Sequence, residues 1–210
     1  MKLIERIGDT KREIKLNASN AYIADAQKSL ISNWQQDLVA LSISIQNGDV
    51  AALTKSGELL KKIHMASLIL GKGGNLDAIK DRDYSSLQSI LQRQLFDGKG
   101  TDGKKYGLRN LFKEVAGGSV SDAQLKNRLT LYSKSGKATQ SLAEINLKQD
   151  TGYKSKKRIL GDVIHCEECI RYASIGWVGI DSDALPPIAV ACSCRNNCRC
   201  TFQYSKTKKH

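Results

Sequence analysis

Apolar side chains recur every three or four residues along the N-terminal three quarters of the chain, which is the period of an α-helix with one buried face. The first such segment begins at Asn20, which we expect to cap it, and ends at Asn47-Gly48, where a glycine favours helix termination. Its inward positions are Ile23, Ala26, Leu30, Trp34, Leu38, Leu41 and Ile45. A second segment runs from Asp49 to Gly71. The short turn between the two predicts an antiparallel helical hairpin within residues 1–80.

Further helices are predicted within residues 83–150. Their expected ranges are 83–95, 108–115, 121–136 and 138–148. Ser121 is a good helix cap, and Gly136 is expected to stop the helix that Ser121 begins. Residues 97–107 are rich in glycine and are interpreted as a surface loop.

The composition changes after Asp150, which indicates a second structural unit. Residues 151–210 start with a basic, polar stretch and contain both prolines, all six cysteines and short extended segments such as 201–204. We therefore predict a helical body over 1–150 and a cysteine-rich, zinc-binding module over 151–210 with a basic C-terminal tail. The expected fold class is mainly α, a multi-helix body with a small zinc-stapled, β-containing C-terminal module.

Length and composition exclude several classes of protein. The chain has 210 residues, of which 40% are hydrophobic and 26% charged, which is enough for a real core and unlike a disordered chain. No apolar run approaches the ~20 residues of a membrane-spanning helix, so no membrane association is expected. The first residues lack the long apolar core of a secretory signal, so the chain is expected to stay in a reducing compartment.

The cysteines are the clearest chemical signal. Cys166 and Cys169 are two residues apart, a spacing that lets both thiolates of a tight turn face one ion. A second cluster follows, composed of Cys192, Cys194, Cys198 and Cys200. Two sulfurs from each cluster would complete a tetrahedral zinc site, and the spacing alone leaves open which pair of the second cluster is used. Disulfides and free thiols are the alternatives to a structural Zn²⁺ ion.

The net charge of the chain is positive, which makes nucleic acid a candidate partner. Its 33 Lys+Arg against 21 Asp+Glu give a formal net charge of +12, which suits an acidic partner. The candidate nucleic-acid contacts are Lys154, Lys156, Lys157 and Arg158. The basic residues are dispersed along the chain, so a solvated surface explains the excess equally well.

Catalytic motifs are weak, and we predict neither an enzyme nor a small-molecule substrate. Gly98, Gly103 and Lys104 come close to a phosphate-binding loop, but Lys105 replaces the serine or threonine that would hold magnesium, and a helix precedes the motif instead of a strand. His64 lies among apolar residues on a predicted helix, where a histidine is usually a partly buried core residue or a surface residue, and nothing nearby completes a catalytic set. His165 and Cys166 are adjacent, so their side chains are expected to point apart.

The C-terminal motifs resemble the end of tailed-phage minor head proteins, the head-morphogenesis family related to the F protein of phage Mu. The motifs are Arg158-Ile-Leu-Gly161, His165-Cys166-Glu-Glu-Cys169, Gly176-Trp177, Leu185-Pro186-Pro187 and Asn197-Cys198-Arg199-Cys200-Thr201. A weaker likeness includes Arg128 and Tyr132, so that the resemblance covers about residues 84–204. The His-Pro that commonly precedes Asn-Cys-Arg-Cys in the family is replaced here by Cys-Arg-Asn.

The resemblance implies both a metal set and a function. It assigns ligands to Cys166, Cys169, Cys198 and Cys200, with Cys194 matching a further His or Cys ligand and Cys192 as an additional cysteine. It implies a phage virion structural protein, a minor capsid or head-morphogenesis component that binds major capsid or portal proteins. The protein would be assembled in the host cytoplasm and located in the virion, where packaged DNA is a further partner.

The alternative function is a zinc-stabilised DNA-binding protein. It would require the module to expose a basic helix, whereas the residues after Cys198 read as a strand. A metal-assisted nuclease is a third reading, which a site closed by four thiolates would exclude.

Overall fold

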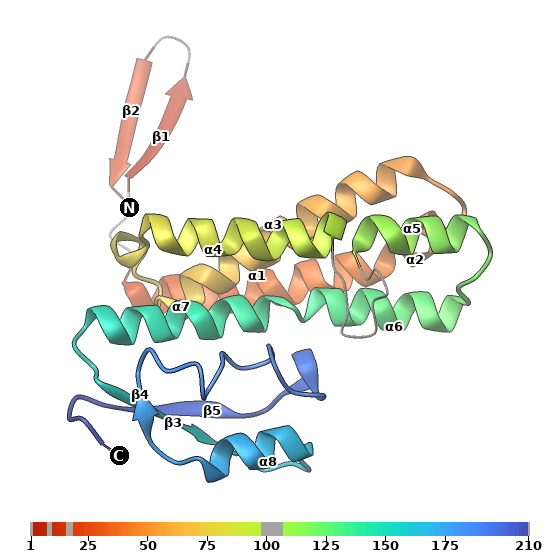
Figure 1. The fold of residues 1–210 in the computed structure, drawn as a ribbon. Coiled ribbons are helices and arrows are strands. Elements are labelled where there is room, and N and C mark those ends of the chain that lie inside the picture. The colour runs from red at the N-terminus through yellow and green to blue at the C-terminus, as the bar shows by residue number, and fades with distance from the viewer. Residues whose placement is uncertain (1, 8–9, 16–18, 98–106, 210) are drawn as a thin grey trace.

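The structure is a computed structural model that describes residues 2–7, 10–15, 19–97 and 107–209 (Figure 1). It is mainly helical, with a small three-stranded antiparallel sheet and a cysteine cluster towards the C-terminus, which confirms the predicted fold class. The near-match to a phosphate-binding loop, from Gly98 to Lys105, lies outside the described residues. None of the helices in the described ranges combines the length and the apolar character needed to cross a membrane.

The chain begins with a strand pair that the helical pattern did not predict. Strands β1 (Lys2–Ile7) and β2 (Thr10–Lys15) are antiparallel, with Lys2 opposite Lys15 and Ile7 opposite Thr10. The β-branched residues of these segments, Ile4, Ile7, Thr10 and Ile14, favour extended structure. The helical hairpin predicted within residues 1–80 therefore begins only at Asn20.

The hairpin itself is formed by α1 (Asn20–Ala40), α2 (Ser42–Gln46) and α3 (Val50–Gly71). Ser19, one residue before the predicted cap, accepts a 3.2 Å hydrogen bond from the Tyr22 N–H. The segment predicted as one helix is interrupted at Leu41, whereas Asp49 caps α3 as predicted. Helices α1 and α3 pack along each other, so the two segments form the expected antiparallel pair.

The remaining helices of the body follow in order. They are the 3-10 turn η1 (Leu76–Ala78), α4 (Asp81–Gln92), the π-helical turn η2 (Arg93–Asp97), α5 (Leu108–Ala116), α6 (Asp122–Ser133) and α7 (Gly136–Asp150). Ser121 and Gln124 form the predicted capping box of α6. Gly136 begins α7 instead of ending α6, because its missing side chain lets α7 approach α3: a Cβ at Gly136 would lie 2.3 Å from the Ser67 hydroxyl.

Leucines and isoleucines from α1, α2, α3, α5 and α6 form the main core. Its fully buried members are Leu38, Leu60, Ile63, Leu108, Leu111, Leu125 and Leu129. A smaller apolar cluster joins α3, α4 and α7. Beside it, the buried ammonium of Lys72 lies 2.8 Å from the Asp83 carboxylate and ties the end of α3 to the start of α4.

The C-terminal module lies alongside α7 (Figure 1). It comprises β3 (Ser155–Ile159), α8 (Glu167–Ser174), β4 (Val178–Gly179), η3 (Arg195–Asn197) and β5 (Thr201–Ser205). The sheet order is β4-β3-β5, all antiparallel, with Arg158 opposite Phe202. The strand predicted after Cys198 is β5, and its partner β3 comes from the basic stretch that had no predicted strand.

Candidate metal centre

The Cys-x-x-Cys motif sits at the start of α8. Cys166 is the N-cap residue with an extended backbone, and Cys169 follows one helical turn later in the helix. Residues three apart at a helix start lie on the same side, so both sulfurs face the same point. The N-terminal end of a helix also favours negative charge, which suits a thiolate ligand.

The second pair of sulfurs comes from the turn before η3. Cys192 and Cys194 flank Ser193, whose hydroxyl donates a 2.8 Å hydrogen bond to the Glu168 carboxylate on α8. Arg195 has a φ of 44°, a left-handed conformation that is strained for a residue with a side chain. The turn therefore folds back sharply, and it is held against the start of α8.

The sulfurs of these two segments converge. The Sγ of Cys194 lies 3.5 Å from those of Cys166 and Cys169 and 3.4 Å from that of Cys192. Within this set of four, all ligand atoms are within 4.8 Å of one another. A disulfide bond would require about 2.05 Å, and all six cysteines are free, so the disulfide alternative does not describe this structure.

The converging set differs from the ligand set that the resemblance implies. Cys166, Cys169 and Cys194 come together as expected, and Cys192, which the resemblance left as an additional cysteine, joins them. Cys198 lies 3.6 Å from Cys169, and Cys200 groups with His165 and Cys169. The Cys-x-Cys spacing of Cys192 and Cys194 is the signal in the sequence that could have found the fourth sulfur.

Burial disfavours the thiolate form of most of the four cysteines. Burial raises the pKa of the Cys169 and Cys194 thiols well above the ordinary value, and it raises that of Cys192 as well. Burial also opposes ionisation of Cys166, but hydrogen bonds with Ser193 and with the backbone of Cys194 lower its pKa to about 6. A positive ion between the sulfurs would be needed to keep all four as thiolates at neutral pH. Sulfur donors select soft or borderline metal ions.

The cysteine-bearing loops are fastened to the helical body by polar contacts. Lys137 on α7 donates to the Cys198 carbonyl, and the Asn196 amide donates a 2.7 Å hydrogen bond to the Leu131 carbonyl at the end of α6. The Ser141 hydroxyl of α7 accepts a 2.8 Å hydrogen bond from the Ile188 N–H. The helical body therefore covers one side of the module.

Two of the four candidate nucleic-acid contacts face inward. Lys156 and Arg158 are only 3% and 2% exposed, and Arg158 lies 4.6 Å from the Tyr172 ring centroid. Lys154 is exposed, and Lys157 is half-buried beneath the Trp177 ring. The structure thus brings only part of this basic stretch to the surface, because alternate residues of β3 point into the module.

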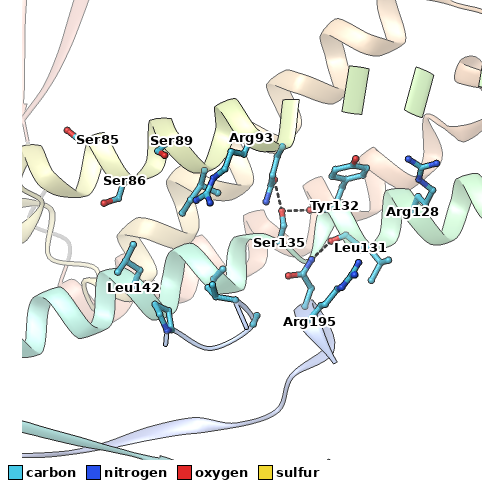
Figure 2. Close-up of a pocket in the computed structure, with 17 residues that line it drawn as sticks. Ser85, Ser86, Ser89, Arg93, Arg128, Leu131, Tyr132, Ser135, Leu142 and Arg195 are labelled. Atoms are coloured by element: carbon cyan, nitrogen blue, oxygen red, sulfur yellow. Dashed lines mark hydrogen bonds between the residues drawn. The ribbon is translucent and has the colours of Figure 1, made fainter. Parts of the chain in front are cut away.

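A groove of about 770 Å³ lies between the body and the module (Figure 2). Its walls are α4, the junction of α6 and α7, and the loop that leads into the second cysteine pair. Three arginines contribute to it from different elements, namely Arg93, Arg128 and Arg195, and we call it the arginine groove. Arg128 is paired with Glu114, while Arg93 and Arg195 are exposed.

A buried polar network lies beneath this groove. His64, for which the sequence left core and surface positions open, is fully buried, and its ring nitrogens lie 2.6 Å from the Thr139 hydroxyl and 3.0 Å from the Ser135 hydroxyl. Burial lowers the pKa of His64 to about 4, although a hydrogen bond with Gln94 opposes the shift. A neutral, weakly basic imidazole that contacts a threonine instead of a carboxylate is poorly suited to activate Ser135. We therefore interpret this network as part of the structural core.

The fold and the site define a helical protein with a C-terminal module whose clustered cysteines could hold a metal ion. No known protein family, no curated protein and no solved structure matches the chain.

Proposed function

We propose that the chain is a minor structural component of a tailed-phage head whose C-terminal module is held in shape by Zn²⁺. The observation that carries the proposal is the convergence of Cys166 and Cys169 with the C-terminal cysteines, on which the family resemblance depends. Zinc–sulfur bonds of about 2.3 Å place the sulfurs of a tetrahedron about 3.8 Å apart. The Cys194 sulfur lies 3.4 to 3.5 Å from the other three sulfurs of the set, close to that value, and all pairs lie within 4.8 Å.

A zinc ion would act here as a structural element. The buried apolar side chains around the cysteines are few, chiefly Ile188 and Ala189, with Phe202 at the edge. Such a module gains much of its folding free energy from metal binding. With four sulfurs occupying a tetrahedral ion, no position remains for a substrate, which fits a structural protein better than a nuclease.

The arginine groove supports a role in binding other virion proteins, either capsid or portal subunits. One wall belongs to the zinc-dependent module, so the shape of the groove depends on the metal centre. The exposed guanidinium groups of Arg93 and Arg195 suit an acidic segment of the partner. We expect the partner to place its apolar side chains over Leu142 and Val190, which also line the groove.

Particle composition tests this function. Purified phage particles should contain the chain at a fixed stoichiometry, and its presence only in the lysate would refute the proposal. The double variant Arg93→Glu/Arg195→Glu should reduce incorporation at least tenfold. Arg109→Glu, an exposed arginine of α5 outside the groove, is the matched control and should incorporate normally.

The DNA-binding alternative receives less support. The module's one α-helix in the described range 155–209 is α8, which starts with Glu167 and Glu168, and two of the four basic candidates are buried. A gel shift at modest salt separates the two functions: a steep loss of duplex DNA binding with added salt would favour the alternative.

A further inference from the structure

The ligand-type side chains of the module form two groups that share one residue. The first group is Cys166, Cys169, Cys192 and Cys194, and the second is His165, Cys169 and Cys200. In each group all ligand atoms lie within 4.8 Å of one another. Cys169 is completely buried at the centre, so its sulfur faces both groups.

His165 is oriented as a metal ligand. Its Nε2 lies 2.8 Å from the Gly161 carbonyl oxygen, and its Nδ1 lies 3.7 Å from the Cys200 sulfur. A proton on Nε2 that is donated to the carbonyl leaves the Nδ1 lone pair directed at the cysteines, which is the usual arrangement of a metal-bound histidine. Gly161 itself lies against the backbone next to Cys200, since a Cβ there would lie 2.6 Å from the Arg199 carbonyl oxygen.

Cys198 belongs to neither group as the sulfurs stand, and it is the candidate for the fourth ligand of the second ion. Its sulfur is 3.6 Å from that of Cys169, and the side chain is only 1% exposed. It precedes the Arg199-Cys200 step that leads into β5. A single ion bound by the first group has its four ligands already and leaves Cys198 and Cys200 unused.

Arg158 provides an independent indication of negative charge at this point. The side chain is buried, and its Nε and Nη1 atoms have no hydrogen-bond partner, while Nη2 donates to the Pro186 carbonyl at 2.7 Å. Among the ion pairs of the described residues, none involves Arg158. The guanidinium lies against the Tyr172 and Phe202 rings, and its charge also acts on Cys200, so a thiolate there would offset part of the cost of burying it.

We propose that the module binds two metal ions of the zinc class that share the Cys169 thiolate as a bridge. Cys166, Cys192 and Cys194 complete the first tetrahedron, and His165, Cys198 and Cys200 complete the second. Seven residues thus fill eight coordination positions. Two divalent ions with six thiolates and a neutral histidine carry a net charge of −2, which the guanidinium of Arg158 partly offsets.

The number of bound ions tests this inference, which rests on the metal centre of the proposed function. Native mass spectrometry and elemental analysis of the reduced, full-length chain should find two equivalents of zinc. One equivalent would overturn the second site and leave the first, whereas none would overturn both. Particle incorporation is measured separately, so failure of the phage assignment is distinguishable from failure of the second site.

Amino-acid variants and loading with ¹¹³Cd test where the second ion binds. Cys200→Ser and His165→Ala should each reduce the content from two equivalents to one, while His210→Ala, which removes a histidine outside the described residues, should retain two. The wild-type protein loaded with ¹¹³Cd should give two resonances, one for four sulfur ligands and one for three sulfurs and a nitrogen, coupled through the shared sulfur. A single resonance, or two equivalents retained in both variants, would overturn the proposal.

Discussion

Helices α3 and α7 cross closely. We therefore predict opposite changes in stability when two glycines of α3 are replaced by alanine. At Gly71, the last residue of α3, an added Cβ would lie 2.3 Å from the Gln140 carbonyl oxygen and 2.7 Å from the Ala143 Cβ. Because the first obstacle is backbone, the α7 helix itself must move. At Gly57 in the same helix, the nearest atom would be Leu95 Cδ2 at 3.6 Å, an ordinary contact.

The magnitude follows from two opposing effects. Replacing glycine by alanine in a helix stabilises by up to about 1 kcal/mol, and overpacking a core costs about 1 to 3 kcal/mol. For Gly57→Ala the first effect stands alone, and we expect stabilisation of about 0.5 to 1 kcal/mol. For Gly71→Ala, a terminal helix position with a backbone clash, we expect a net loss of about 2 kcal/mol, or about 4 to 8 °C in Tm.

Thermal and urea unfolding, followed by far-UV circular dichroism with zinc and reductant present, measure both variants. We expect Gly71→Ala to be less stable than the wild type and Gly57→Ala to be more stable. Equal stability of Gly71→Ala and the wild type would refute it, since α7 would then not be packed against the Gly71 backbone at the distance described.

Three further predictions concern buried charge and the metal. Asp83→Asn leaves the Lys72 ammonium buried without its partner and should cost about 3 to 5 kcal/mol in urea unfolding, part of which the added change Lys72→Met should restore. The folded-state pKa of His64 is about 4 against about 6.5 when unfolded, so the unfolded state binds the extra proton and stability falls as pH drops through this window. At pH 5 the loss relative to pH 7 should be about 2 kcal/mol greater for the metal-free wild type than for metal-free His64→Asn; equal pH dependence would contradict the burial argument. Chelation should abolish the near-UV signal of Trp177 in the module and leave most of the helical signal, and coincident loss of both would show that the body depends on the metal.

The sequence by itself determined the helical body and its principal ends. Heptad-like spacing of apolar residues is a local property, and a cap such as Asp49 or Ser121 acts on a backbone N–H two or three residues away. These features can therefore be read without knowledge of the rest of the fold. The composition change after Asp150 likewise marked where the helical pattern gives way to the cysteine module.

Tertiary structure alone decided the features that join distant segments. At Gly136, the start of α7, the neighbouring α3 leaves no room for a side chain, and Lys156 and Arg158 are buried because they lie on the face of β3 that packs into the module. The grouping of the sulfurs depends in the same way on how the turn at Cys192 folds back onto α8. Spacing along a chain limits which cysteines can be neighbours, but only the path of the backbone through space selects among them, since the free energy of a contact depends on distance in space and not on distance in sequence.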